Sequence, residues 1–478
     1  MLVVRRPPRT IPGRSGHPRA GPDASRRTFA GVPRRPLPFL RHPAQLVVLG
    51  FGGAVAVGTL LLLLPMSTRA DGGPGFVTAL FTATSAVCVT GLTVVDTAGY
   101  WSGFGQGVIL LLIQVGGFGT MTLASLLGLL VSRRLGLRSR LTAAAETKSL
   151  GLGDVRSVLL GVARTTLVVE AVVAVLLTLR FWLGYDEGLG RAVYLGVFHS
   201  VSAFNNAGFA LWSDSLTRFV TDPWICLPIA VAVIVGGLGF PVLLELRRQL
   251  GRPRRWSLHT RMTVYATVAL LVLGTAFVTA NEWRNPDTLG ALSPPGRVLA
   301  GFFQAVMPRT AGFNSLDYGM MNEGTLLGTM VLMFIGGGSA GTAGGIKVTT
   351  FLVLFYVIWT EVRGERDVHA FGRRISDRVA RQALTVALLS VGAVVTATVA
   401  LVEITGLTTH QVLFEVVSAF ATVGLSTGIT ADLGTPAHLV LVSLMFIGRL
   451  GPITLVSALA LRERQRLYQY PEGRPIIG

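Results

Sequence analysis

The sequence predicts an all-α polytopic membrane protein made of four tandem helix–re-entrant loop–helix repeats, with eight transmembrane helices. Composition is the first observation: the 478 residues are 51% hydrophobic and only 14% charged, whereas soluble domains usually carry about 25% charged residues. The mean hydropathy of +0.59 agrees with this class. Long apolar stretches recur along the chain, and a short glycine-containing motif recurs four times between them.

Eight apolar stretches are long enough, at roughly 20 residues, to cross the ~30 Å hydrocarbon layer of a bilayer. They are 46–65, 106–131, 158–183, 223–247, 262–281, 325–360, 382–404 and 437–461. Residues 1–45 are rich in Arg and Pro and predict a disordered basic cytoplasmic tail. The first apolar stretch begins too far along the chain, and lacks the small-residue cleavage site, for a secretory signal.

The positions of the basic residues predict the orientation. Of the 42 Lys and Arg residues, 32 lie in 1–45, 132–157, 247–261, 361–381 and 461–478, which all fall on one side of the membrane if the eight spans are correct. An excess of Lys and Arg marks the cytoplasmic face. We therefore expect a multi-pass protein of the cell membrane with both termini in the cytoplasm, including the C-terminal tail 462–478. The net charge of +18 is explained by topology, and no nucleic-acid partner is needed.

The recurring motif reads SAVCVTGL at 85–92, SAFNNAGF at 202–209, VMPRTAGF at 306–313 and SAFATVGL at 418–425. A second glycine signature follows each copy: VGGFG at 115–119, VGGLG at 235–239, IGGGS at 335–339 and IGRLG at 447–451. Repetition at this length indicates one supersecondary unit copied four times. The predicted repeats are 46–131, 158–248, 261–362 and 381–461.

Re-entrant backbone survives at membrane depth only inside protein or beside a water-filled cavity. Four loops around one central pore can form a ring of backbone carbonyls that replaces the hydration shell of a cation. A glycine in each loop permits the backbone conformation that turns these carbonyls inward. The predicted filter positions are Val89, Thr90, Gly91, Asn206, Ala207, Gly208, Thr310, Ala311, Gly312, Thr422, Val423 and Gly424. They include no carboxylate, which suits a monovalent ion.

Charged residues flank these loops. Asp96, Asp214, Asp317 and Asp432 follow the four glycines, and they are either solvated turn residues or a group that concentrates cations at the pore mouth. Arg309 lies three residues before Gly312. We expect it behind the filter, where pairing with a carboxylate such as Glu415 would brace the loop. Cys88 and Cys226 are far apart, predict no disulfide or metal site, and are read as small buried hydrophobic residues.

The four loops in order, RTAGFNSLD at 309–317 and GGGSAGTAGGIKVTTF at 336–351 resemble the Trk/Ktr/HKT superfamily of potassium transporters. The resemblance covers about residues 45–465 and is nearest to the Ktr (KtrB-type) membrane subunit, because no two extra helices precede the eight spans. It implies a potassium uptake subunit that forms a homodimer on a cytoplasmic nucleotide-binding regulatory subunit (KtrA/TrkA-like). K⁺ would be the transported ion, Na⁺ is a candidate activator, and this chain itself would hold no cofactor.

Residues 336–347 carry six glycines within the longest apolar stretch, which a continuous helix tolerates poorly at ~1 kcal/mol each. The resemblance implies an intramembrane gating loop below the filter; the alternative is a kink where helices pack closely. The gating residues implied are Gly336, Gly337, Gly338, Ser339, Gly341, Thr342, Gly344, Gly345, Lys347 and Arg449. Arg449 replaces a glycine in IGRLG, and a charge within a span is costly and usually functional. The alternative for Arg449 is a structural pair with Glu403 or Glu170.

Two other classes are less compatible with the sequence. A secondary cation symporter with a closed midplane site is commonly built from inverted repeats, whereas all four units here point the same way. An enzyme is not predicted, because HExxH, GxSxG, Walker motifs and paired intramembrane carboxylates are missing from the sequence. The loops differ at Cys88 and at Asn205–Asn206, so the pore need not be fourfold symmetric and could admit some sodium or rubidium.

Overall fold

The computed structural model describes residues 43–70, 72–134 and 155–451. Over these residues the regular secondary structure is helical, apart from one two-stranded hairpin. The predicted tails lie outside the described residues, except for 43–45, which begin the first helix. The all-helical class predicted from the sequence is confirmed.

Each predicted repeat contains a long outer helix, a short helix that ends at the glycine motif, and a helix that follows it. The first contains α1 (Pro43–Leu62), η1 (Pro65–Ser67), α2 (Phe76–Val87), α3 (Thr97–Tyr100) and α4 (Gly103–Arg134). The second contains α6 (Val155–Gly184), α7 (Leu189–Phe204), η2 (Thr217–Phe219), α8 (Pro223–Leu238) and α9 (Phe240–Gln249), and is followed by η3 (Pro253–Arg255).

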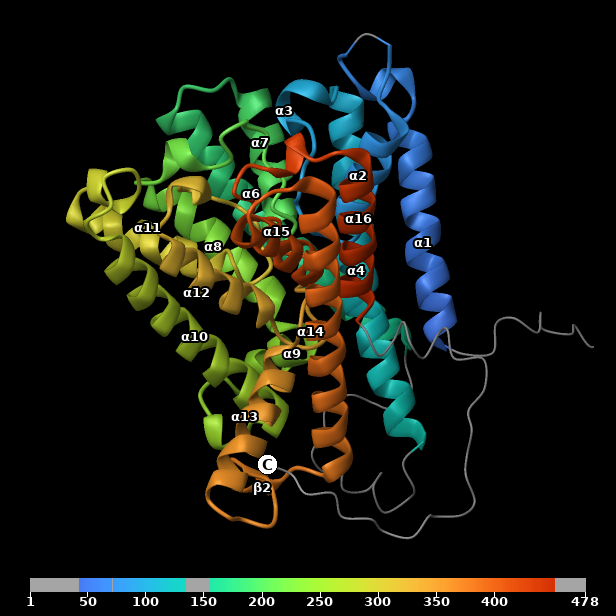
Figure 1. Ribbon diagram of the computed structural model, residues 1–478, viewed down its shortest axis with the longest axis vertical. Helices are drawn as coiled ribbons and strands as arrows, with labels where there is room; N and C mark the ends of the chain where they lie inside the picture. The colour runs from blue at the N-terminus through green and yellow to red at the C-terminus, as the bar shows by residue number, and fades with distance from the viewer. Residues whose placement is uncertain (1–42, 71, 135–154, 452–478) are drawn as a thin grey trace, which may run out of the picture. The chain divides into compact units, whose positions relative to one another are not determined.

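The third contains α10 (Leu258–Glu282), η4 (Leu289–Ala291), α11 (Pro294–Val306), η5 (Tyr318–Met320), α12 (Glu323–Phe334) and α13 (Val348–Val362). Strands β1 (His369–Ala370) and β2 (Arg373–Arg374) form an antiparallel hairpin before the fourth repeat. The fourth contains α14 (Asp377–Thr405), α15 (Thr409–Ala421), η6 (Thr430–Asp432) and α16 (Thr435–Leu450). In Figure 1 the hairpin lies at the opposite end of the helices from α3.

Within the described residues, five helices are long and apolar enough to cross a membrane: α1, α4, α6, α10 and α14. The predicted span 223–247 is instead a bent pair, since α8 and α9 meet at 103°. The predicted span 325–360 is interrupted between α12 and α13, and α16 ends where the described residues end. The count of eight spans therefore stays a prediction, while the polytopic class is clear.

The bend between α8 and α9 occurs at Gly239, whose φ of +91° is accessible mainly to glycine. A Cβ at this position would lie 2.4 Å from the carbonyl oxygen of Ser339, so the backbone of the third repeat also requires glycine here. Continuous apolar patterning hides such a break, because residues on both sides of it are hydrophobic. This is why the sequence alone predicted one straight span.

The short helices α2, α7, α11 and α15 are the most buried elements of the fold. Their last turns are almost completely enclosed, as Val87, Phe204, Val306 and Phe420 show. Polar residues at the ends of these helices are therefore held in protein and not in lipid. Each short helix delivers one glycine motif to the interior of the helical assembly.

Candidate functional site

The four motif glycines form a closed ring. A Cβ on Gly91 would lie 2.3 Å from the carbonyl oxygen of Ala207, and one on Gly208 would lie 2.6 Å from that of Ala311. The same relation joins Gly312 to the Val423 oxygen at 2.2 Å, and Gly424 to the Thr90 oxygen at 2.1 Å. Each loop therefore contacts the next in chain order, and the fourth contacts the first. No residue larger than glycine fits at these four positions without moving a neighbouring backbone.

The loops also share one backbone conformation. The glycines have φ of +90°, +68°, +76° and +95° in chain order. Two residues earlier, Val89, Asn206, Thr310 and Thr422 have φ of +55°, +59°, +75° and +50°. Left-handed backbone is costly for such residues, and above all for the β-branched Val89 and the two threonines, and persists only where surrounding contacts enforce it. The predicted filter residues are thus brought together as four equivalent, strained loops.

Serine at the first motif position holds three of the loops. The Ser85 hydroxyl donates to the Leu92 carbonyl at 2.7 Å and accepts from the Gly91 N–H at 3.0 Å. Ser202 donates to the Phe209 carbonyl, and Ser418 accepts from the Gly424 N–H. The third repeat has Val306 at this position and makes no such bond. Sequence reasoning missed this role, although the fixed spacing of six residues between Ser and Gly was a visible signal.

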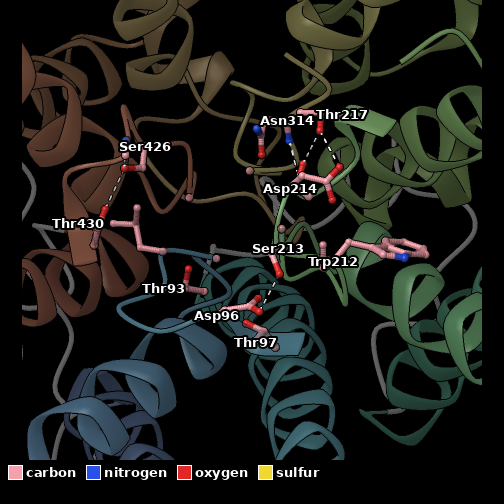
Figure 2. A pocket seen from close by; sticks show the side chains of 18 of the residues that line it. Thr93, Asp96, Thr97, Trp212, Ser213, Asp214, Thr217, Asn314, Ser426 and Thr430 are labelled. Atoms are coloured by element: carbon pink, nitrogen blue, oxygen red, sulfur yellow. Dashed lines mark hydrogen bonds between the residues drawn. The ribbon is translucent and has the colours of Figure 1, made fainter. Parts of the chain in front are cut away.

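An open cavity of about 750 Å³ lies against the ring, and all four motif glycines line it. Figure 2 shows this cavity with Asp96 and Ser213 facing one another, and with Asp214, Thr217 and Asn314 close together. The carboxylates that line it are Asp96, Asp214, Asp287 and Asp317. Asp432 is not among the lining residues, so the structure brings only three of the four predicted aspartates to the cavity, and adds Asp287.

These carboxylates also have structural partners. Asp96 accepts N–H bonds from Ala98 and Gly99 at the start of α3, and a hydroxyl bond from Ser213 at 2.8 Å. Asp214 pairs with Arg218 at 2.7 Å. Burial raises the pKa of the Asp214 carboxyl, but hydrogen bonds from Arg218 and Thr217 outweigh burial and bring it below its ordinary value of 3.8. Asp96 and Asp214 therefore stabilise local turns and also place negative charge at the cavity, while a role in concentrating cations stays a prediction.

Residues 336–347 form a loop directly behind the ring. Its two ends pair, since the Gly336 N–H donates to the Ile346 carbonyl at 2.9 Å. A Cβ on Gly344 would lie 1.9 Å from the Thr422 hydroxyl oxygen, so this part of the loop contacts the fourth glycine motif. The Thr342 hydroxyl donates to the Phe204 carbonyl, the residue that ends α7. The helix is thus interrupted between Phe334 and Val348, where the six glycines lie, and a gating role for this loop stays a prediction.

The same loop is hydrogen-bonded to the bend between α8 and α9. The Gly338 N–H donates to the Gly237 carbonyl at 2.7 Å, and the Thr342 N–H to the Gly236 carbonyl at 3.1 Å. In return, the Phe240 N–H donates to the Ala340 carbonyl at 3.2 Å. Two helix breaks in different repeats thus satisfy one another's backbone groups, which would otherwise be unpaired in the interior. The Lys347 ammonium donates to the Ala343 carbonyl, and Ser339 contacts Thr349.

Arg449, on the last turn of α16, points into this loop. Its guanidinium donates to the Thr342 carbonyl, to the Gly116 carbonyl at 3.2 Å and to the Thr120 hydroxyl at 2.9 Å. The alternative of a pair with Glu170 is wrong, because the carboxylate of Glu170 bonds to Gln114 and Asn205. Glu403 is exposed near the end of α14 and is not a partner either. Arg449 therefore joins α4 to the loop through neutral oxygens.

Arg309 lies behind the third motif, as expected, but the predicted partner is wrong. Its guanidinium donates to the Thr267 carbonyl and hydroxyl at 3.3 Å and to the Gly336 carbonyl at 3.4 Å. Glu415 instead accepts bonds from Ser426, Thr427 and Thr430 in its own repeat. A carboxylate on α15 faces the outer side of its loop, whereas Arg309 faces α10. Arg309 thus connects the third motif to the start of loop 336–347.

The fold and the ring of backbone loops define an integral membrane protein of the class that moves ions across a bilayer. The sequence profile of the family described as TrkH, cation transport protein, matches residues 55–470. The chain therefore belongs to the TrkH family of cation transport proteins. This confirms the resemblance read from the four motifs.

Individual relatives agree over nearly the whole chain. It is 39% identical to the Ktr system potassium uptake protein B of Bacillus subtilis, over 91% of this chain and 97% of that protein. Identity is also 39% to the protein of the same name from Vibrio alginolyticus, over 91% and 94%. The potassium/sodium uptake protein NtpJ of Enterococcus hirae is 35% identical, over 91% and 97%.

The fold is also shared with a solved structure. The crystal structure of the potassium transporter TrkH from Vibrio parahaemolyticus superposes with a TM-score of 0.69, over 88% of this chain and 86% of that chain. Sequence identity is 20%, so this likeness speaks for the fold alone.

Proposed function

We propose that this protein is a potassium uptake subunit in which K⁺ passes through the ring formed by the four glycine motifs. The observation that carries the proposal is ring closure: the Thr90, Ala207, Ala311 and Val423 carbonyl oxygens each abut the glycine of a neighbouring loop. A cation that leaves water needs oxygen ligands from all sides, and one loop cannot supply them. The relatives named as potassium uptake proteins support K⁺ as the ion.

The outer cavity would deliver the ion to this ring. Asp96, Asp214 and Asp317 place negative charge around a cavity whose floor includes the motif glycines. Clefts lined by one sign of charge raise the local concentration of the opposite ion. No carboxylate lies at the filter positions themselves, so the cation is coordinated by neutral carbonyl oxygens once it enters.

Loop 336–347 and Arg449 would form the gate. The loop lies behind the ring, on the face away from the outer cavity, and Arg449 adds a positive charge hydrogen-bonded to Thr342. A cation leaving the ring inward would meet both. Opening would require the loop to leave its hydrogen bonds with Gly236 and Gly237, which are few and therefore reversible.

Rubidium uptake into proteoliposomes tests the proposal. Purified protein should take up Rb⁺ down its gradient, and excess K⁺ should block this uptake. The alternative, a secondary cation symporter with a closed midplane site, predicts that Rb⁺ moves only together with a second ion gradient. Uptake that needs a Na⁺ or H⁺ gradient would therefore replace the channel-like mechanism by the symporter. The same assay with and without added Na⁺ tests Na⁺ as an activator, which the name of the Enterococcus relative also raises.

We further propose that the protein works as a homodimer with a cytoplasmic nucleotide-binding regulatory subunit. Two relatives are named as components of a Ktr system, which implies a further subunit in those organisms. Co-purification with the product of a neighbouring regulatory gene, and the mass of the complex in detergent, test both assignments. A monomer that conducts at its full rate without any partner would contradict them.

A further inference from the structure

The second glycine motif has an anchor that the other three lack. Asn205 lies three residues before Gly208, and its side-chain N–H₂ group donates to the Glu170 carboxylate and to the Gln114 side-chain oxygen, both at 2.9 Å. Gln114 in turn donates to the other Glu170 oxygen at 3.3 Å. Asn205 directly follows α7, whereas Glu170 lies in α6 and Gln114 in α4, and Glu170 and Asn205 are almost completely buried. They form a closed polar cluster behind the loop.

The cluster is not a salt bridge, and it extends beyond a helix cap. Asn205 is the C-cap residue of α7, and its side-chain N–H₂ group also donates to the Val201 carbonyl at 2.9 Å. Both Glu170 oxygens accept from amide groups, and no lysine or arginine in the described part of the chain forms an ion pair with Glu170. A buried carboxyl group is costly unless it is well hydrogen-bonded. Placing one in the middle of α6 only to bind Asn205 and Gln114 therefore indicates a role beyond helix packing.

The neighbouring backbone explains what the anchor would do. Asn205 directly precedes Asn206, whose φ is +59°, and the next two residues, Ala207 and Gly208, complete the loop. Strained backbone keeps its conformation only when neighbouring contacts enforce it. Gly117 of α4 makes room for the anchor, since a Cβ there would lie 1.9 Å from the Asn205 side-chain oxygen.

The corresponding residues of the other motifs make different contacts. They are Cys88, which is buried, Ala421, which has no polar side chain, and Arg309, which contacts Thr267 and Gly336. The second loop is thus the one whose position is set by a carboxyl group on a neighbouring span.

We propose that Glu170, acting through Asn205, is a positioning residue that fixes the second filter loop and so sets how well the ring distinguishes K⁺ and Rb⁺ from Na⁺. This rests on the proposed function. If the anchor is lost, the carbonyls of Asn206 and Ala207 relax, and a looser ring accommodates the wrong ion more easily. Discrimination then falls, whereas assembly of the other three loops is unaffected.

The test is Rb⁺ uptake into proteoliposomes with increasing Na⁺ as competitor, which measures discrimination apart from maximal rate. Glu170→Ala and Asn205→Ala should each lower the Na⁺ concentration that halves Rb⁺ uptake by about fivefold, the effect expected from loss of one hydrogen bond. Glu170→Gln keeps an oxygen that can accept from Asn205, and should remain within about twofold of wild type. Glu403→Ala, on an exposed part of α14, is the matched control and should behave as wild type.

Gly117→Ala tests the same contact from α4, since it changes none of the three side chains chemically but its added Cβ would displace Asn205. It should lower the discrimination between Rb⁺ and Na⁺ as Asn205→Ala does. If Glu170→Ala or Asn205→Ala fails to reach the membrane, Gln114→Ala takes its place. Unchanged Na⁺ competition in Glu170→Ala and Asn205→Ala would overturn the inference. It would also fall if Glu170→Gln lost as much as Glu170→Ala while Asn205→Ala kept full discrimination. A wild-type protein that takes up no Rb⁺ would instead overturn the proposed function.

Discussion

At the scale of single residues, the four motif glycines combine two constraints that usually occur apart. Each has a left-handed backbone conformation, and each faces the carbonyl oxygen of a neighbouring loop at a distance too short for a Cβ. The first constraint is local, and the second comes from another repeat, more than one hundred residues away along the chain. Glycine satisfies both, which explains why it recurs while the residues around it vary.

Replacing Gly91 by Ala should abolish Rb⁺ uptake while leaving much of the fold intact. The added Cβ would lie 2.3 Å from the Ala207 oxygen, so the first and second loops must separate. Gly107→Ala, on an open face of α4 where nothing lies within 4 Å, is the matched control. Uptake at the wild-type rate by purified Gly91→Ala protein would show that the ring is not the conduction path.

Arg449 is a second case in which one side chain matters, because its proposed role depends on three hydrogen bonds. Arg449→Ala should raise Rb⁺ uptake in the absence of a regulatory partner, since the bonds to Thr342 and Gly116 are lost and a positive charge leaves the inner side of the ring. The change should also weaken the response to a regulatory subunit. Unaltered flux together with unaltered regulation would remove Arg449 from the gate.

The Asp214–Arg218 pair predicts how the outer cavity responds to acid. Because the pKa of Asp214 is lowered, its stabilising contribution is present above the ordinary value of 3.8 and is lost as the pH falls below it. The effect of Asp214→Asn on the thermal midpoint should therefore be the same at about pH 7 and pH 5, and should shrink only in stronger acid. The pair is half-exposed, so its contribution is at most about 1 kcal/mol. If the stabilising contribution of Asp214 were already lost at pH 5, this would contradict a lowered pKa for its carboxyl group.

At the scale of elements, two helix breaks depend on one another. The bend at Gly239 and loop 336–347 exchange three backbone hydrogen bonds, so neither break leaves its polar groups unpaired. α9 leads from this bend to Glu245, whose carboxylate accepts bonds from Ser257 and Thr260 at the start of α10. A displacement at the end of α9 would thus act on the loop through a short, continuous connection.

Gly239→Ala should disturb the gate without touching the ring. A Cβ here would lie 2.4 Å from the Ser339 oxygen and would be strained at φ of +91°, which costs of order 1–3 kcal/mol. We expect a lower thermal midpoint and a higher Rb⁺ leak without any partner. Gly392→Ala in α14, where nothing lies within 4 Å, provides the control. Normal gating in Gly239→Ala would mean that the two breaks are not coupled.

At the scale of the whole molecule, the cavity carboxylates and the arginine-rich connections are predicted to lie on opposite sides of the membrane. Ser213 is exposed at the outer cavity, and Glu365 is exposed between α13 and β1. The native cysteines Cys88 and Cys226 are buried, so they should react little with a thiol reagent. An impermeant thiol reagent added to intact cells should label Ser213→Cys and spare Glu365→Cys. The reverse pattern would invert the topology.

Much of this architecture could be predicted from the sequence because repetition is visible without any partner. Four copies of one motif, each after a short apolar run, located the short helices α2, α7, α11 and α15 and the glycines at their ends. Six glycines in twelve residues likewise located the interruption between α12 and α13. In these places the helices end for a local reason, since glycine content and apolar length act within a few residues.

The partners of the charged residues could not be predicted in this way. Glu415 was expected beside Arg309, and Glu170 was one alternative partner for Arg449, yet both carboxylates accept hydrogen bonds within other clusters. The bond from Arg449 to Thr342 spans 107 residues, and that to Gly116 spans 333. A carboxylate and a guanidinium can be matched by charge in many ways, and only the packing of the helices selects among them.

The sequence by itself determined that this chain is a polytopic helical protein of four like units, each with a glycine at one critical place, because apolar length and repetition are properties of the chain alone. Only the tertiary structure decided that the four glycines close into one ring, that α8 bends into α9, and that Asn205 is held by Glu170. Those facts depend on distances between repeats, and such distances exist only once the repeats have packed together.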